Sequence, residues 1–329
     1  MQIKSNIVLS GDIGGTKTRL AIIEVNGTQL NTLREVSYPS QNYPTFDELV
    51  ADFLNGSDIP SCAGLGIAGP VQGRVVQTTN LPWRIDADAL QRQFGFARCV
   101  LLNDLEATAC GLPALCAVDL LTLHAGAANA VGNQAVIAAG TGLGEAGLFW
   151  DGHAHQPFAT EGGHTSFTAS DDREFALLKY LQQRYEHVSW ERVVSGMGIV
   201  ALYEFMCHYH HTTAPAWLKE EMEKGDLAAA IANAAMAERD ELCVETLDWF
   251  LQLYGSEAGN MALKMMSRGG VYLGGGIAPK ILSRLQNGIF LKAFFNKGRM
   301  SSLLEAIPVK VILNDKAALY GAALFAARD

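Results

Sequence analysis

The sequence predicts an α/β protein with two domains, and three observations lead to this fold class. The chain has 329 residues, which is too long for a single small hydrophobic core. Strand patterns and helix patterns alternate along it. A strand, a glycine-rich hairpin and a second strand also follow one another twice, near residue 14 and near residue 141. This repeat predicts a duplicated architecture.

The composition argues against two classes of partner. Hydrophobic residues make up 49% of the chain and charged residues 18%, as in a folded globular protein. A net charge of −9 repels phosphate backbones, so no nucleic-acid partner is expected. No uncharged run is long enough to span a bilayer, and the N-terminus lacks a basic segment followed by a long apolar one. We therefore expect no membrane partner and a cytoplasmic location.

The cysteines lie in apolar surroundings and form no Cys-x-x-Cys pair. They are expected to be small buried side chains in a reducing compartment. The six are Cys62, Cys99, Cys110, Cys116, Cys207 and Cys243.

The first glycine-rich stretch, residues 11–18, lies between the strand patterns 7–9 and 19–23. Its glycines therefore sit at a hairpin tip, whereas Rossmann and Walker phosphate loops continue into a helix. Without a Cβ, Gly14 and Gly15 can take left-handed dihedrals and bring N–H groups close to an anion, and Asp12 can hold a hydrated cation. Polyphosphate with Mg²⁺ fits this combination, and an ordinary turn is the alternative.

The next segments alternate in the same way. A third strand is expected at 33–38, and Thr45 and Glu48 form a capping box for a helix that ends near Gly56. Glycines weaken the strand 63–69 unless another backbone or a ligand comes close. Asp86 is expected to cap a helix that ends at Gly95.

A short buried strand, residues 99–102, leads into Asn103 and Asp104. Open α/β sheets bind ligands just past the carboxyl ends of their strands, so Asp104 is a candidate for chemistry. The alternative is that Asp104 only caps a following helix, residues 105–112.

The second half repeats the pattern with strands at 134–139 and 146–150 around Gly140, Thr141 and Gly142. Apolar residues at spacings of three and four predict a long helix over 244–265. A triple glycine, residues 274–276, then follows a strand and precedes Pro279. Such a backbone suits close contact with a flat ligand such as adenosine, and a plain loop is the alternative.

Six motifs in this order resemble the bacterial glucokinases of the hexokinase/actin/Hsp70 superfamily. They are Gly-Asp-Ile-Gly-Gly-Thr at 11–16, Leu-Asn-Asp at 102–104, Ala-Gly-Thr-Gly-Leu-Gly at 139–144, Glu-Gly-Gly-His at 161–164, Glu-Arg-Val-Val-Ser-Gly at 191–196 and Gly-Gly-Gly-Ile-Ala-Pro at 274–279. Each motif alone is weak, but together they span nearly the whole chain. The zinc-dependent relatives need a cysteine cluster soon after His164, and the next cysteine is Cys207, so the non-zinc type is expected.

The resemblance implies a two-domain actin-like ATPase fold, which is ribonuclease H-like, with an inter-domain cleft. The small domain would be residues 1–105 plus 314–329, and the large domain residues 106–313. ATP and Mg²⁺ would be the cofactors, glucose the substrate, and a homodimer the assembly.

The resemblance also assigns roles to single residues. Asp104 would be the general base, Asn103 would orient the sugar, and Glu161, His164 and Glu191 would bind sugar hydroxyls, which carboxylates and imidazole suit chemically. Thr16 and Thr141 would contact phosphates, and Asp12 would hold Mg²⁺ through water. The expected ATP-binding set is Gly11, Asp12, Ile13, Gly14, Gly15, Thr16, Gly140, Thr141, Gly142, Gly274, Gly275 and Gly276.

Three features depart from the pattern or invite another interpretation. Glu145 places a carboxylate beside the second hairpin, where the family has a small apolar residue, and Met197 replaces a proline. Residues 208–211 contain three histidines, but a solvated helix end explains them better than a metal site. A kinase for another hexose or amino sugar and a non-catalytic sugar or nucleotide sensor remain as alternative functions.

Overall fold

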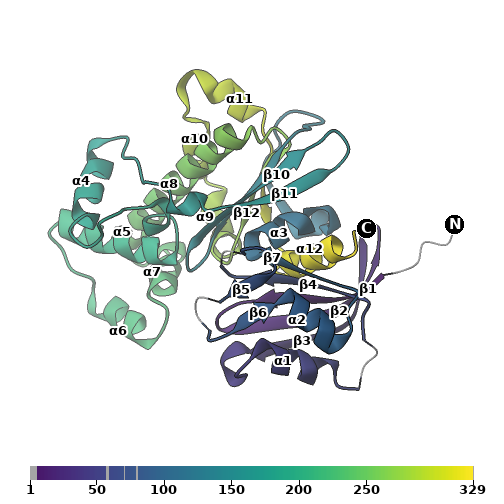
Figure 1. Ribbon diagram of the computed structural model, residues 1–329. Helices are drawn as coiled ribbons and strands as arrows, with labels where there is room; N and C mark the ends of the chain where they lie inside the picture. Colours follow the sequence, from purple (N-terminus) through teal and green to yellow (C-terminus); the bar gives the residue numbers. More distant parts are fainter. Residues whose placement is uncertain (1–5, 57–58, 70, 79–80, 329) are drawn as a thin grey trace. The chain divides into compact units, whose positions relative to one another are not determined.

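The computed structural model describes residues 6–56, 59–69, 71–78 and 81–328 (Figure 1). The chain divides into two compact units. Unit 1 comprises residues 1–120, 157–159 and 314–329, and unit 2 comprises residues 121–156 and 160–313. The sequence analysis placed its domain boundary after residue 105, whereas this division falls after Leu120 and keeps helix α3 (Asp104–Gly111) in unit 1.

Unit 1 contains a five-stranded sheet with the order β3-β2-β1-β4-β7. The glycine hairpin joins β1 to β2 as an antiparallel pair, and β4 and β7 extend the sheet in parallel from β1. The predicted first hairpin is therefore confirmed. The strands are β1 (Asn6–Ile13), β2 (Lys17–Asn26), β3 (Gln29–Pro39), β4 (Cys62–Ile67) and β7 (Arg98–Asn103), with a separate ribbon of β5 (Val75–Gln77) and β6 (Arg84–Asp86).

Helices cover both faces of this sheet because successive strand residues point to opposite sides. On one face, Leu9 and Leu65 pack with apolar side chains of α1 (Phe46–Leu54) and α2 (Ala87–Phe94). On the other face, Val8 and Ile23 pack with α12 (Ala317–Ala326), which lies beside α3 (Figure 1).

Local sequence signals place these helices as expected. Thr45 accepts a hydrogen bond from Glu48 N and caps α1, and Asp86 caps α2, which ends at the left-handed Gly95. Gly64 in β4 gives α12 room, because a Cβ there would overlap the carbonyl oxygen of Ala322. The glycine in this strand thus serves a close backbone approach.

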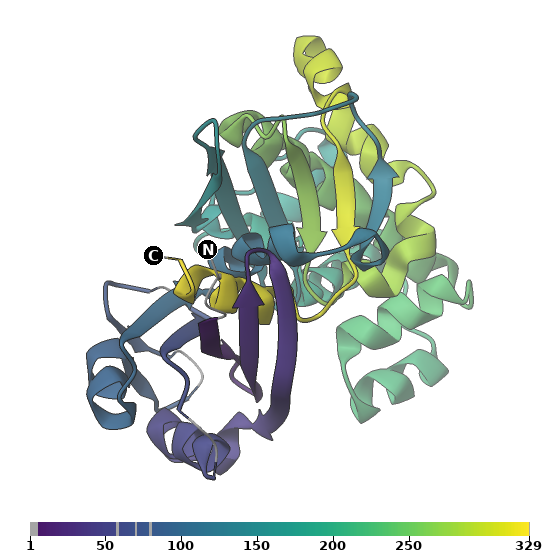
Figure 2. The ribbon, with the colours of Figure 1, turned by 90° about the vertical axis from the view of Figure 1, so that its right-hand side faces the viewer.

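Unit 2 contains a six-stranded sheet with the order β11-β10-β9-β12-β13-β8 (Figure 2). The second glycine hairpin joins β9 and β10 as an antiparallel pair, and β12 and β13 follow in parallel. Apart from β8, this order repeats that of unit 1, which confirms the duplicated architecture. The strands are β8 (Leu120–His124), β9 (Gln134–Ala139), β10 (Leu143–Trp150), β11 (His155–Thr160), β12 (Gly270–Gly274) and β13 (Val309–Ile312).

The core of unit 2 is built around the long helix α8 (Glu241–Met265), which the spacing pattern predicted over 244–265. Its buried side chains pack with residues of β9, β12 and the neighbouring helices. The other helices are α4 (Asp172–Leu181), α5 (Gly196–Tyr209), α6 (Ala216–Lys224), α7 (Leu227–Met236), α9 (Leu282–Leu285), α10 (Ile289–Phe295) and α11 (Ser301–Glu305).

Short 3₁₀ turns connect these elements. They are Ser40–Asn42, Leu112–Ala114, Ala117–Asp119, Gly162–His164, Trp190–Arg192, Ala278–Ile281 and Gly298–Met300.

Not all of the cysteines fit the prediction of buried side chains, because Cys62 and Cys207 are only half-buried. Cys99, Cys110 and Cys243 are buried, but Cys116 is exposed and its thiol donates to Asp119 Oδ2 at 3.0 Å. This thiol takes part in capping a 3₁₀ turn, so its polarity and not its apolar character places it. Among the described residues, no helix has the length and apolar character needed to cross a membrane.

Candidate active site

The first hairpin turns at residues 14–16 in unit 1. Gly14 N donates to Lys17 O at 3.0 Å, and Ser40 holds the turn by donating its hydroxyl to Gly14 O at 2.8 Å. Gly14 does not take a left-handed φ, so the expectation of left-handed dihedrals is wrong at this position. Ser40 stabilises the turn from outside instead. Gly11 lies within β1 at a tightly packed point, because a Cβ added to it would lie 2.8 Å from Leu65 Cδ2.

Asp12 lies at the end of β1, partly buried beside a charged cluster of unit 1. Burial raises the pKa of the Asp12 carboxyl, and the nearby Arg19 opposes this effect. Arg19 is itself engaged, because its Nη2 lies 2.7 Å from Asp315 Oδ2. Lys17 also lowers this pKa, but no ion pair engages Asp12 among the described residues, and its carboxylate oxygens suit a hydrated Mg²⁺.

Asn103 and Asp104 lie at the carboxyl end of β7, where the sequence placed them. Asn103, not Asp104, caps α3: its Oδ1 accepts from Leu105 N at 2.9 Å and from Glu106 N at 3.4 Å. The alternative that Asp104 is the N-cap is therefore wrong. Asn103 also donates Nδ2 to Gly69 O at 3.0 Å, so this side chain is held in place. Asp104 is the first residue of α3.

The second hairpin turns at residues 140–142 in unit 2. Gly140 N donates to Gly142 O at 2.9 Å, and Gly196 N donates to Gly140 O at 2.7 Å. The latter bond ties the hairpin to the N-terminus of α5, which Ser195 caps by accepting from Gly198 N at 3.0 Å. A glycine hairpin and a helix N-terminus thus meet, and both offer N–H groups to an anion. The sequence analysis missed this use of Ser195 and Gly196.

Glu161, His164 and Glu191 come together beside this hairpin. His164 Nδ1 lies 3.6 Å from Glu161 Oε2, and His164 Nε2 lies 3.8 Å from Glu191 Oε1. The side chains of Glu161 and His164 are 67% and 63% exposed, whereas Glu191 is 18% exposed. Their carboxylate and imidazole groups can bind several hydroxyls at once.

Glu191 connects this cluster to the hairpin. Its Oε2 accepts from Leu143 N at 3.0 Å, and a Cβ on Gly142 would overlap the same carboxylate. The cluster of Glu161, His164 and Glu191 is therefore in contact with the second hairpin within unit 2.

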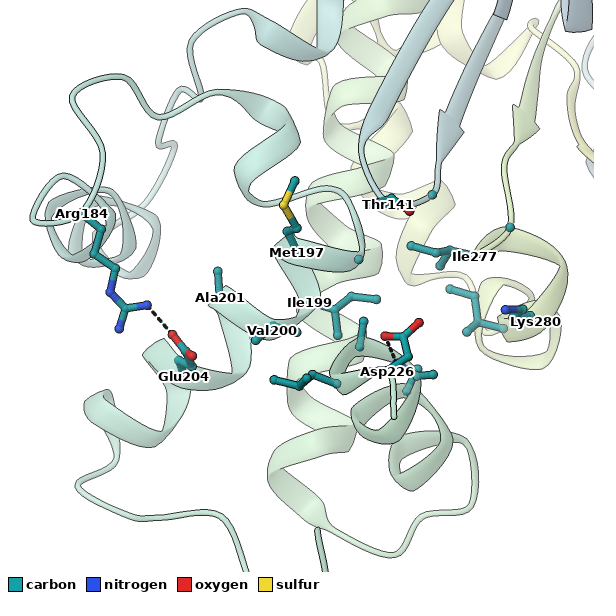
Figure 3. A pocket seen from close by; sticks show the side chains of 18 of the residues that line it. Thr141, Arg184, Met197, Ile199, Val200, Ala201, Glu204, Asp226, Ile277 and Lys280 are labelled. Carbon is teal, nitrogen blue, oxygen red and sulfur yellow. Dashed lines mark hydrogen bonds and ion pairs between the residues drawn. The ribbon is translucent and has the colours of Figure 1, made fainter. Parts of the chain in front are cut away.

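A cavity of about 770 Å³ borders the hairpin at Gly140 and Thr141 (Figure 3). Gly140, Thr141 and Gly276 border it, and apolar side chains of α5 and α7 form much of the wall. Its lining also includes Met197, Ile199, Ala228, Ile277 and Lys280. Concave, mostly apolar sites of this size are typical of small-molecule binding.

The triple glycine contributes unequally to this cavity. Gly274 is buried at the end of β12, where a Cβ would lie 3.3 Å from the Cβ of Ala138. Gly275 takes a left-handed φ of +80°, which favours glycine, and a side chain there would also overlap the backbone of Ala139. Gly276 alone of the three lines the cavity.

Most of the residues that line the cavity could not be predicted from the sequence. Arg184 and Glu204 form an ion pair at its rim, and Asp226 caps α7 by accepting from Ala229 N at 3.2 Å. These residues come from separate segments that only the fold brings together. The fold places Asp226 and Thr141 on the same cavity although they are far apart in the chain.

Trp83 and the histidine cluster at residues 208–211 do not line this cavity. Trp83 is 1% exposed and donates Nε1 to Tyr43 O at 2.9 Å, as a core aromatic does. His208 and His210 are exposed at the end of α5, and no group of three metal-ligating side chains occurs among the described residues. The solvated helix end is thus confirmed.

Glu145 does not face the cavity. It is 4% exposed, and a Cβ on Gly162 would overlap its Oε2. The carboxylate beside the second hairpin is therefore directed into unit 2, beneath the segment that carries Glu161 and His164.

Comparisons with known proteins agree with this geometry. The family model described as Glucokinase matches residues 9–329. A glucokinase of Nostoc punctiforme is 43% identical over 98% of this chain and 99% of its own length. The crystal structure of a glucokinase from an Antarctic psychrotroph is 33% identical, covers 98% of both chains and has a TM-score of 0.86.

A more distant structure shares the fold at 20% identity. It is the ROK family glucokinase from Streptomyces griseus in complex with glucose and AMPPNP, which covers 97% of this chain and 99% of its own, with a TM-score of 0.64. The likenesses establish the two-domain actin-like ATPase fold that the sequence predicted. From the family match and the identity over nearly the full length, the chain belongs to the glucokinase family.

Proposed function

We propose that this protein transfers the γ-phosphoryl group of ATP to glucose and forms glucose 6-phosphate. One observation carries the proposal: the hairpin at residues 140–142 borders the large cavity through Gly140 and Thr141 and touches the Glu191 carboxylate at Gly142. A kinase needs its donor phosphates and its acceptor hydroxyl next to each other, and a single hairpin between two binding sites meets this need. The family's ATP and glucose specificity supports the same choice.

The sugar is bound by Glu161, His164 and Glu191. Glu191 is oriented by the N–H of Leu143, and His187 Nε2 lies 3.0 Å from the carbonyl oxygen of His164. Orientation by backbone groups reduces the entropy lost when the side chains bind hydroxyls. Asn103, fixed by Gly69 and by the first turn of α3, supplies its amide to the sugar.

Asp104 is the general base. A sugar hydroxyl becomes acidic only as its oxygen bonds to phosphorus, so a carboxylate with an ordinary pKa near 3.9 can take the proton at that stage. Asn103 is the N-cap of α3, and Asp104 Oδ1 also accepts a hydrogen bond from Leu105 N at 2.9 Å.

The two hairpins bind the nucleotide phosphates through their N–H groups and the hydroxyls of Thr16 and Thr141. The cavity takes the adenosine, with Gly276 against its flat face. Mg²⁺, when bound, neutralises charge on the phosphate oxygens, and Asp12 holds it through water. A homodimer belongs to the same proposal, and sedimentation velocity tests it.

The test is ATP consumption measured with and without sugar. We expect consumption that depends on glucose, with galactose and ribose as poor substrates, because a missing or inverted hydroxyl leaves a polar group of the site unpaired. Faster turnover of mannose or glucosamine than of glucose would favour a kinase for another hexose or amino sugar. Sugar binding without turnover of any sugar would favour a sensor.

A further inference from the structure

Glu145 is a buried carboxyl that the proposed reaction does not use. It lies on β10 opposite Ile137 of β9, and its Oε1 has no hydrogen-bond partner among the described residues. Burial of such a group destabilises a fold more than burial of an apolar side chain of similar size. Its position relative to the sugar-binding residues suggests a function.

The side chain and backbone of Glu145 both contact the sugar-binding loop, which we define as residues 161–164. The carboxyl occupies the space that a Cβ would take at Gly162. Thr160 Oγ1 donates to Glu145 O at 3.0 Å and accepts from Gly162 N at 3.2 Å. Glu145 and Gly162 are therefore linked twice, once by packing and once through a hydroxyl.

The neighbouring part of β10 supports the same loop. A Cβ on Gly163 would overlap the carbonyl oxygen of Leu143, and Leu143 N donates to Glu191. Gly162 and Gly163 both pack against β10 without free space between them and the strand. A small displacement of β10 or of Glu145 is thus transmitted to the loop that carries Glu161 and His164.

The charged neighbours of Glu145 come from α8 and from the loop. Burial, and then repulsion by the buried Glu257, raise the pKa of Glu145 to about 8, while Lys264 acts in the opposite direction. Lys264 Nζ lies 3.6 Å from Glu257 Oε1, and Tyr254 donates its hydroxyl to Ile137 O at 3.0 Å. On the loop, Glu161 and His164 are exposed. Glu145 is therefore uncharged at neutral pH.

We propose that Glu145 is a positioning residue that packs beneath Gly162 and holds the sugar-binding loop in the conformation that takes glucose. The inference rests on the proposed function, because it assumes that this loop binds the sugar. Once Glu145 ionises, a charge lies next to Glu257 and the Gly162 backbone, and the nearby Lys264 already pairs with Glu257. The side chain then moves toward water and displaces the loop, so glucose binds more weakly.

The test compares the wild type with Glu145→Gln, which keeps the shape of the side chain but cannot ionise. KM for glucose and kcat are measured from pH 6.5 to 9.5 in the same buffers. We expect the wild-type KM to rise about three- to tenfold between pH 7 and pH 9, the range that the loss of one proton allows, relative to the KM of the variant. The ratio of the two kcat values is expected to stay within about twofold. Parallel KM profiles would overturn the inference.

A second variant keeps the test decisive if Glu145→Gln does not fold. Glu257→Gln removes the repelling charge, so the rise in KM is expected to begin at lower pH; an unmoved midpoint contradicts the inference. The matched control is Glu174→Gln, because Glu174 is 3% exposed in the same unit but bonds to Ser170, at 2.7 Å to its N and 2.6 Å to its hydroxyl. This control should keep the wild-type profile.

Amide hydrogen exchange separates this inference from the proposed function. We expect the protection of residues 161–164 to fall above pH 8 in the wild type, relative to Glu145→Gln, whichever sugar is phosphorylated. Equal protection in both proteins would overturn the positioning role even in an active glucose kinase. Absence of sugar phosphorylation by the wild type would instead overturn the function.

Discussion

The two sheets share a strand order but differ in the side chains at their strand ends. In unit 1, Asp12 is the penultimate residue of β1, and Asp104 directly follows β7. In unit 2, the corresponding positions are Ala138 in β9 and Leu313 after β13. The polar residues of unit 2 lie instead on the segments around Glu161, His164 and Glu191.

This difference indicates that the two halves of the duplicated fold have different tasks. The carboxylates of unit 1 suit proton transfer and cation binding, which are steps of the reaction. Unit 2 offers a large cavity and a hydroxyl-binding cluster, which are means of binding. We therefore expect substitutions in unit 1 to lower kcat and substitutions in the sugar cluster of unit 2 to raise KM.

The largest effect is expected for Asp104→Asn. The amide cannot accept the proton, so kcat should fall by roughly 10²–10⁴, the usual contribution of a general base, with little change in nucleotide affinity. Stability should change little because Asn103 caps α3 and an asparagine at position 104 keeps an oxygen that can accept from Leu105 N. The measurements are kcat, ATP affinity and melting temperature on one preparation.

Asp86→Asn is the matched control for this substitution. Asp86 caps α2 in the same unit by accepting from Asp88 N at 3.0 Å, and asparagine caps helices equally well. The Asp86→Asn variant should have the kcat of the wild type. Near wild-type kcat in a folded Asp104→Asn protein would remove Asp104 as the base.

Features that depend on a few neighbouring residues could be predicted from the sequence. Thr45 and Asp86 were predicted as caps because a cap depends on three or four neighbouring residues. The choice between Asn103 and Asp104 as the cap of α3 was not predictable, since both are good caps and the path of the chain after β7 decides.

Long-range features were beyond the sequence for the same reason. The pattern could not place Glu145 beneath Gly162, because that contact joins β10 to a loop beyond β11. The cavity wall around Thr141, Asp226 and Gly276 comes from segments far apart in the chain. The glycines themselves were visible, but what each one approaches was not.

The second effect in size concerns the stability of Glu145→Gln. The unfolded chain loses this proton near its ordinary pKa of 4.5, whereas the folded chain keeps it to about pH 8. The wild type therefore loses stability as pH rises between these values, by up to about 1.4 kcal/mol per pH unit. Glutamine has no such dependence, so its stability relative to the wild type should grow from pH 5 to pH 8. Denaturant titrations at several pH values measure this, and a constant difference would contradict it.

A smaller effect is expected for Glu191→Gln. The amide keeps an acceptor for Leu143 N but loses the charge and one acceptor oxygen, at a cost of about 1–3 kcal/mol in sugar binding, or a rise of about 5- to 150-fold in KM for glucose. Its kcat should change less. Glu221→Gln, which removes an exposed ion pair with Arg239, serves as the control and should keep the wild-type KM. A fall in kcat at constant KM would mean that unit 2 also takes part in the chemical step.

The smallest effect is the protection that glucose gives to the fold. Binding to the native state alone, at ten times the dissociation constant, stabilises by about 1.4 kcal/mol, which corresponds to a rise in melting temperature of roughly 2 °C for a chain of this length. If unit 2 binds the sugar and unit 1 supplies the groups that react, Asp104→Asn should show nearly the wild-type shift in melting temperature, although it has lost turnover. Glu191→Gln, at the same glucose concentration, should show a smaller shift although it retains turnover at saturation. Differential scanning calorimetry of the three proteins, with and without glucose, measures the three shifts in melting temperature. A shift lost in Asp104→Asn and kept in Glu191→Gln would reverse the assignment of the two tasks, because the sugar would then depend on unit 1 for its affinity.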